Sequence, residues 1–324
     1  MQAGSTQVAT RRAALRKRRR REGLRTFAFL SPWLTGVGLL VAYPLAATVY
    51  FSFTSYDQIN PPKFVGMRNW KYVFTQYPPF WQALRNTLWL VVVMVTLRVI
   101  FGLGIGMLAV ALKTGAKVFR TVLYLPVLVP PVAATIGFVF LLNPSTGPVS
   151  AVFGWAGFTA PAMFADPMWA KPALTLLALW GVGDLMVIFM AALLDVPVSL
   201  YEAAGLDGAN RRQRFRYITL PTISPVVLFA VITGVIATMQ YYTQAIVAGK
   251  LASGANAGPG GSFQPGFPEG STLTVPQLVY SLGFQNFNVG AASVLALVLF
   301  ILSMAITGPL LSRRLGFITA EDSR

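Results

Sequence analysis

Residues Val198–Pro221 read VSLYEAAGLDGANRRQRFRYITLP, a polar, arginine-rich interruption between two long apolar stretches. Ser199 and Glu202 have the spacing of a capping box, in which the two side chains satisfy free backbone amides at the start of a helix. This spacing predicts a helix that starts near Ser199 and makes two turns over Leu200–Leu206.

A turn and a second helix are expected to follow. Asp207-Gly208 predicts the turn, because glycine accepts backbone angles that a regular helix does not use. Asn210 is expected to cap a short helix that runs through Phe215, with Pro221 beyond its end. The whole segment therefore reads as a helix-turn-helix loop that is built like a docking element for another protein.

The composition indicates a membrane protein. Of the 324 residues, 55% are hydrophobic and 11% are charged, whereas soluble domains carry about 25% charged residues. The chain has no cysteine and no histidine. This excludes disulfides, a zinc site built from these two residue types and a Ser-His-Asp centre. No metal site is expected.

Six stretches of about 20 apolar residues are long enough to cross a bilayer as helices. We therefore expect an all-α integral membrane protein with a transmembrane domain over residues 27–311. The predicted spans are Phe27–Phe53, Leu84–Leu112, Val118–Leu142, Pro172–Leu194, Pro225–Ala248 and Val289–Leu311.

The distribution of basic residues predicts the orientation. With the amino end inside, the inner flanks hold nineteen of the 26 Lys and Arg residues and the outer segments hold six; Arg98 falls within a span. Such an excess marks the cytoplasmic side. We expect a multi-pass protein of the cytoplasmic membrane with cytoplasmic tails at 1–26 and 312–324 and loop 198–221 inside. The run between Arg11 and Arg25 lacks aromatic or groove-reading elements, so nucleic acid is not an expected partner.

The third outer loop begins with a stretch rich in glycine, proline and serine, over residues 249–270. Such a composition is typical of a mobile connection. The sequence assigns no role to this stretch.

No nucleotide-binding motif is present, because the chain contains no Gly-x-x-x-x-Gly-Lys-Ser/Thr phosphate loop. Gly102, Gly104 and Gly106 lie within the second span, where small residues let helices approach closely. We therefore interpret these glycines as packing positions, and expect no catalytic residue and no cofactor in this chain.

Two opposite charges fall within spans. Arg98 lies near the middle of the second span and Asp184 near the middle of the fourth. A charge at the bilayer centre costs roughly 2.5–3.5 kcal/mol on insertion scales, so such groups usually face the protein interior with a partner. Three interpretations stay open: the two residues pair, they line a translocation path, or they contact another subunit.

Polar and aromatic residues gather at the end of the fifth span. Gln240, Tyr241, Tyr242 and Gln244 offer rings beside amide and hydroxyl groups, and Trp180 is a weaker candidate of the same kind. These groups suit a sugar, which stacks its C–H faces and needs hydrogen bonds. The alternative is that they mark the outer membrane interface.

The pattern EAA-x-x-DG-A at Glu202–Ala209, followed by Phe215, Ile218, Leu220 and Pro221, resembles the EAA loop of permease subunits in binding-protein-dependent ABC importers. The likeness extends to FLSPWLTGVGLLVAYPLAATVYFSFTSYD and to NFNVGAASVLALVLFILSMAIT. These stretches are similar to carbohydrate importer subunits of the maltose and glycerol-3-phosphate type, whose fold is the type I importer permease fold.

The resemblance implies that the loop is a coupling helix seated in a groove of a separate ATPase. The implied coupling residues are Glu202, Ala203, Ala204, Asp207, Gly208, Ala209 and Pro221. The arginines that follow would contact the ATPase or lipid headgroups.

The resemblance also implies the partners: a second homologous permease, two ATPase subunits that bind ATP and Mg²⁺, and an extracytoplasmic solute-binding protein. The expected cargo is a sugar or a sugar-like solute. A channel or an ion-coupled secondary transporter is the alternative, and it would need no ATPase.

Overall fold

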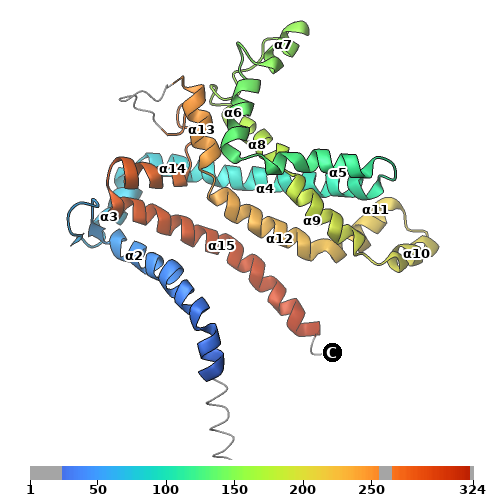
Figure 1. Cartoon of the computed structure of the whole chain (residues 1–324), viewed down its shortest axis with the longest axis horizontal. Coiled ribbons are helices and arrows are strands. Elements are labelled where there is room, and N and C mark those ends of the chain that lie inside the picture. The colour runs from blue at the N-terminus through green and yellow to red at the C-terminus, as the bar shows by residue number, and fades with distance from the viewer. Residues whose placement is uncertain (1–23, 255–264, 322–324) are drawn as a thin grey trace, which may run out of the picture.

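The computed structural model describes residues 24–254 and 265–321, with side chains up to residue 312. Most of the basic amino-terminal run and part of the Gly/Pro-rich loop, for which predictions are made above, lie outside these residues. Long helices run lengthwise through the molecule (Figure 1). The loop predicted from Val198–Pro221 lies at one end of these helices, and a short hairpin lies at the other.

Four helical stretches are long and apolar enough to cross a membrane. They are Leu24–Ser52, which contains the π-helix η1 (Gly38–Ala42) and α2 (Tyr43–Ser52); α4 (Pro79–Ala111); Arg211–Met239, which joins α11 (Arg211–Arg214), η4 (Phe215–Thr219) and α12 (Leu220–Met239); and Val289–Ser312, the first part of α15 (Val289–Glu321).

The predicted third and fourth spans are broken helices. In the third, α5 (Ala116–Tyr124) and the 3-10 turn η3 (Leu125–Leu128) meet α6 (Pro131–Leu141) at 102°. In the fourth, α8 (Ala170–Trp180) meets α9 (Gly183–Leu194) at 50°. With each pair counted as one span, the described residues contain the six predicted spans.

The third span breaks at a cluster of prolines, and the fourth breaks at Gly181 and Gly183. LPVLVPP places three prolines where the third span bends, and each proline lacks the amide hydrogen that a continuous helix needs.

The predicted fifth span is wrong at its outer end. It stops at Met239, and α13 (Thr243–Ala252) begins after a short turn.

Shorter elements complete the described fold. They are β1 (Thr54–Ser55) and β2 (Lys63–Phe64), which pair antiparallel with Thr54 opposite Phe64; α3 (Arg68–Lys71); η2 (Tyr72–Gln76); α7 (Pro148–Trp155); α10 (Val198–Leu206); α14 (Val275–Tyr280); and η5 (Ser281–Gln285).

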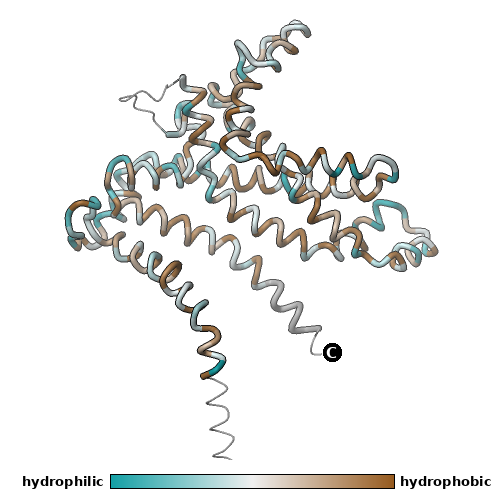
Figure 2. The backbone as a smooth tube through the Cα atoms, viewed as in Figure 1, coloured by the Kyte–Doolittle hydropathy of each residue, from teal (hydrophilic) through white to brown (hydrophobic). Residues whose placement is uncertain are grey.

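The surfaces of the long helices are apolar. Figure 2 shows hydrophobic residues along the helices and hydrophilic residues concentrated at their ends and in loops. In the first span, none of the apolar 18-residue window is buried, and Phe29 and Leu40 are 87% and 78% exposed. A helix that is apolar around its whole circumference fits a lipid environment.

The α4–α9 contact is built on two of the three glycines of the second span. A Cβ at Gly102 would lie 2.7 Å from Leu185 Cβ, and one at Gly106 would lie 3.1 Å from Phe189 Cβ. Nothing lies within 4 Å of a Cβ at Gly104. The packing interpretation is confirmed for Gly102 and Gly106 and is wrong for Gly104, which faces away from α9.

This difference predicts the outcome of two matched substitutions. Gly102→Ala forces Leu185 to shift and is expected to destabilise the protein by about 1–3 kcal/mol, the usual cost of overpacking. Gly104→Ala adds a methyl group in open space and is expected to keep stability or raise it by up to about 1 kcal/mol, because alanine favours a helix more than glycine does. Thermal unfolding of the two variants in detergent checks this, and equal melting temperatures would contradict the close α4–α9 contact.

Candidate functional site

The polar loop begins at a proline. Helix α10 starts at Val198 with Pro197 as its N-cap, and no side chain caps it. The predicted capping box of Ser199 and Glu202 is therefore wrong. Pro197 starts the helix early, so Ser199 already lies inside the first turn, where its own backbone is helical and it cannot act as a cap.

The predicted turn is present and ends α10 in a Schellman motif. Gly208 has φ +75°, the left-handed conformation that glycine adopts without strain. The amide of Gly208 donates to the Gly205 carbonyl at 3.2 Å, and that of Ala209 donates to the Ala204 carbonyl at 2.9 Å. These two bonds satisfy the last carbonyls of α10 and fix the direction in which the chain leaves it.

The second helix starts as predicted but does not stop as predicted. Asn210 Oδ1 accepts from the Gln213 amide at 3.0 Å, and Gln213 Oε1 accepts from the Asn210 amide at 2.8 Å, which completes a capping box. The helix then continues past Phe215 through the π-helix η4 into α12. Pro221 therefore does not lie beyond the helix: it is the second residue of α12, in the first turn, where the missing amide hydrogen of a proline costs little.

Two side-chain bonds hold the halves of the loop together. Arg214 Nε donates to the Ala209 carbonyl at 2.8 Å. The hydroxyls of Tyr201 and Thr219 lie 2.8 Å apart, which joins α10 to the end of η4. The loop is thus one rigid unit, attached directly to a helix that runs back through the molecule.

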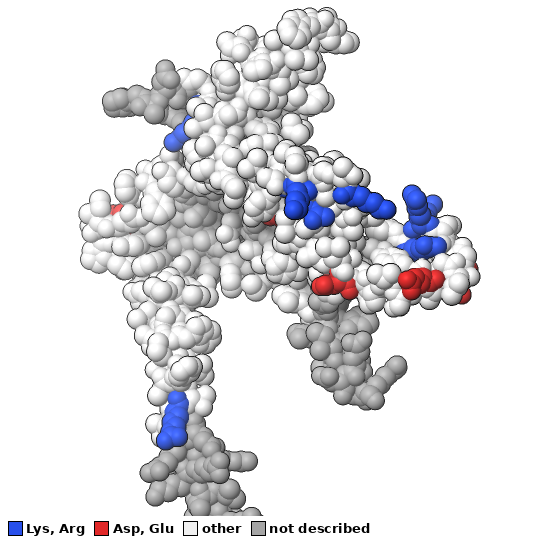
Figure 3. All heavy atoms as spheres, turned by 45° about the vertical axis from the view of Figure 1, so that its right-hand side comes forward, with Lys and Arg blue, Asp and Glu red and all other residues white. Residues whose placement is uncertain are grey.

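The predicted coupling residues share the surface of this unit. Glu202, Ala203, Asp207 and Gly208 are exposed, and Ala204 and Ala209 are partly buried. Leu206, at the end of α10, is 92% exposed. Basic side chains gather over this end of the molecule (Figure 3); in the sequence they belong to the start of α5 and to α11–η4.

A cavity of about 700 Å³ lies where the breaks in the helices meet. Its walls come from α4, from the α8–α9 break, from η3 and the start of α6, and from the turn between α12 and α13. The helix breaks thus place polar backbone next to a hollow, which is where irregular backbone is tolerated at membrane depth.

Five of the predicted path residues line this cavity: Arg98, Trp180, Gln240, Tyr241 and Gln244. Tyr242 does not line it; its ring lies 5.4 Å from that of Tyr280. Pro126, Val129 and Pro131 also line the cavity, although they are not predicted above as path residues. The LPVLVPP run was the available signal, because clustered prolines mark a broken helix.

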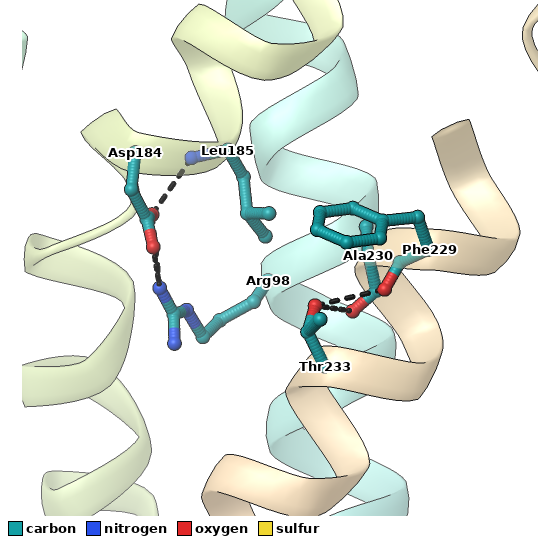
Figure 4. Close-up of polar contacts among 6 residues, drawn as sticks. All are labelled: Arg98, Asp184, Leu185, Phe229, Ala230 and Thr233. Carbon is teal, nitrogen blue, oxygen red and sulfur yellow. Dashed lines mark hydrogen bonds and ion pairs between the residues drawn. The ribbon is translucent and has the colours of Figure 1, made fainter. Parts of the chain in front are cut away.

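Arg98 and Asp184 lie against each other (Figure 4). Arg98 Nη2 is 2.9 Å from each oxygen of the Asp184 carboxylate. Asp184 occupies the first turn of α9, where the helix dipole favours a negative charge. The side chains are 25% and 43% exposed, so the pair lies at a boundary between packed helices and the hollow beside them.

A broken-helix membrane bundle around a polar cavity, with a rigid helical loop at one end, has the architecture of a transport permease. The family described as binding-protein-dependent transport system inner membrane component matches residues 98–316. The chain belongs to this family and is a permease subunit of an ABC importer.

Two relatives resemble the chain over nearly their whole length. The probable ABC transporter permease protein YesP of Bacillus subtilis is 32% identical over 297 residues, which cover 91% of this chain and 92% of that protein. The sulfoquinovosyl glycerol transport system permease protein SmoG of Agrobacterium fabrum is 30% identical, covering 86% of each chain.

A solved structure shares the fold. It is that of a bacterial alginate ABC transporter in complex with alginate pentasaccharide-bound periplasmic protein. One of its chains superposes with a TM-score of 0.75 at 22% identity, over 92% of this chain and 97% of that one. The predicted type I importer permease fold is confirmed.

Proposed function

We propose that this permease carries a sugar or a sugar-like solute across the cytoplasmic membrane. The observation that carries the proposal is the lining of the cavity: the Trp180 indole faces the same hollow as the amides of Gln240 and Gln244 and the hydroxyl-bearing Thr238. A sugar needs both a flat apolar surface and several hydrogen-bonding groups. The relative SmoG is named for the transport of sulfoquinovosyl glycerol. Its cargo is a sugar derivative, which supports a carbohydrate cargo here, but it bears a sulfonate and so does not indicate the charge of the cargo of this chain.

The proposed assembly follows from two features of the chain. It has a rigid helical loop at Val198–Pro221, and its sequence contains no phosphate-binding loop. Two separate ATPase subunits bind ATP and Mg²⁺ and dock on the coupling loops of this chain and of a second, homologous permease. The cavity is completed at the interface between the two permeases. An extracytoplasmic solute-binding protein delivers the cargo to the end of the molecule that carries β1 and β2.

The structure offers a physical route from the loop to the cavity. The helical stretch Arg211–Met239 is 29 residues long, or about 44 Å at a helical rise of 1.5 Å per residue. It begins at the Asn210 cap and ends next to Thr238 and Gln240, which line the cavity. We propose that closure of the ATPases moves this helix as a rod, which switches the cavity between its two openings.

Two substitutions at the junction of α12 and α13 test the cargo class. Gln244→Leu removes an amide from the cavity and is expected to weaken uptake of the cargo sugar about 2–10-fold, the value of a lost hydrogen bond of about 0.5–1.5 kcal/mol. Tyr242→Phe is the matched control, because Tyr242 lies outside the cavity lining. Uptake of radiolabelled sugars by cells that depend on this transporter measures both. An equal effect of the two changes would contradict the placement of the sugar.

A further inference from the structure

We propose that Arg98 and Asp184 form a charge-neutral recognition site that makes this permease accept uncharged sugars and reject sugars bearing a carboxylate or a sulfonate. This inference rests on the carbohydrate function proposed above and specifies its substrate class. It concerns one wall of the cavity, where α4 and α9 meet.

The pair is built into a rigid part of the protein. Gly102, one turn from Arg98 on α4, lets Leu185 of α9 approach closely, and Leu185 follows Asp184 in the chain. Asp184 is held further by its own helix, because the Leu185 amide lies 2.7 Å from Asp184 Oδ1. The carboxylate is thus fixed at the start of α9, where the helix dipole also stabilises it. An incoming anion would have to displace a carboxylate that is held from two sides.

Arg98 keeps donors that no protein group uses. A single nitrogen, Nη2, contacts both oxygens of Asp184. The Nε atom is buried and has no hydrogen-bond partner among the described residues. The Thr233 hydroxyl on the facing helix α12 donates to the Phe229 carbonyl of its own helix at 2.8 Å (Figure 4). Nη1 makes no hydrogen bond within the described residues either, and unlike Nε it is not fully buried, so it is the donor that a cargo in the cavity can use.

The charges around Arg98 determine which hydrogen-bond acceptor of the cargo fits beside its guanidinium. Arg98 is the only charged residue that lines the large cavity in the part of the chain that the structure describes, and its charge is cancelled by Asp184. A second, smaller cavity of about 140 Å³ is lined by both Arg98 and Asp184, so the carboxylate stays close to any group that contacts the guanidinium.

These charges favour an uncharged cargo. An anionic sugar would bring a net negative charge into a site whose own charges already sum to zero, and burying an uncompensated charge is expensive. A sugar hydroxyl, in contrast, accepts a charge-assisted bond from the guanidinium without disturbing the pair.

The test compares matched probes on the assembled transporter in nanodiscs. The probes are cellobiose and cellobiuronic acid, and digalactose and digalacturonic acid, which differ within each pair by carboxylates. Ligand-observed saturation-transfer NMR gives the relative affinity of each pair, because it detects weak binding and does not require turnover. The wild type is expected to bind the neutral member at least tenfold more tightly than the acid.

Three variants assign the selectivity to the pair. Asp184→Asn frees the guanidinium and is expected to raise the affinity for the acid relative to the neutral sugar at least tenfold. Asp184→Glu keeps the pair neutral and is expected to preserve the wild-type ratio. The double variant R98Q/D184N, which has no charge at either position, is expected to return the ratio toward the wild type even if D184N alone assembles poorly.

The outcomes separate this inference from the proposed function. Equal or tighter binding of the acids by the wild type overturns the inference and leaves the carbohydrate function standing. An unchanged ratio in D184N, in complexes that still assemble, overturns it as well. If no sugar, neutral or acidic, binds the wild type or enters cells that depend on this transporter, the carbohydrate function fails, and the inference fails with it.

Discussion

Replacing Gly208 with valine is expected to lower ATP-driven transport at least tenfold. Gly208 has φ +75° and ends α10 in a Schellman motif. A β-branched residue is strained in this conformation by about 1–3 kcal/mol. Rotating the backbone to relieve the strain breaks the bonds to Ala204 and Gly205 and changes the angle between α10 and α11. Because about 1.4 kcal/mol corresponds to a tenfold change in binding, the loss of docking alone reaches the expected size.

The measurement is binding-protein-stimulated ATP hydrolysis by the reconstituted complex, together with the amount of ATPase that co-purifies with the tagged chain. Gly208→Asn is the matched control, since asparagine tolerates the left-handed conformation better than other non-glycine residues. It is expected to retain most of the activity. Full stimulation in the valine variant would show that the turn at Gly208 is not part of the coupling surface.

Gly183→Ala is expected to prevent correct packing of the broken fourth span. A Cβ at Gly183 would lie 2.2 Å from the Leu123 carbonyl oxygen and 2.9 Å from Tyr124 Cα. Both are backbone atoms, so a rotamer change cannot relieve the clash. Helix α9 would have to move away from α5, and Asp184, the next residue, would move with it. We expect a loss of folded protein larger than that of any side-chain truncation in the cavity.

The yield of monodisperse protein after membrane extraction measures this effect. Gly181→Ala lies in the same break, but the atom nearest to the added Cβ, the Ala178 carbonyl oxygen, is 3.9 Å away. This control is expected to give the wild-type yield. If both variants give the same yield, the close approach of α9 to Leu123 does not occur in the membrane.

The loop shows how far local sequence patterns reach. Gly208 and Asn210 were identified correctly, because a left-handed turn and an N-cap depend on a few neighbouring residues. The predicted start of α10 is wrong, because Pro197 is already the N-cap and Ser199 lies within the first turn. The prediction that Pro221 lies beyond a helix is wrong, because the π turn η4, which joins α11 to α12 before Pro221, has no sequence signal of its own.

The membrane spans show a second limit. Apolar length predicted which segments are long enough to cross the bilayer but not that two of them are broken. Hydropathy is averaged over about 20 residues, so it does not reveal the helix breaks at the prolines near Val129 and at the glycines beside Val182. Those breaks position the cavity. Five of the predicted residues nevertheless line the cavity, because Arg98, Trp180 and the residues after Met239 stand out chemically in apolar surroundings.

The partnership of Arg98 with Asp184 was one of three open interpretations of the sequence. Residues 86 positions apart in the chain meet only because α4 and α9 pack through Gly102 and Gly106. Sequence spacing carries no information about such a contact. The structure decides it by placing both side chains at the same helix contact.

The central claim is that the loop Val198–Pro221 receives the motion of a separate ATPase. Site-specific cross-linking tests this claim most directly. The chain has no cysteine, so a single introduced cysteine is the only thiol it carries. Leu206, 92% exposed at the end of α10, and Ile59, 83% exposed at the opposite end, are matched positions. We predict that Leu206→Cys cross-links to a protein with a phosphate-binding loop and that Ile59→Cys does not. Cross-linking of that ATPase through Ile59→Cys and not through Leu206→Cys would contradict the account.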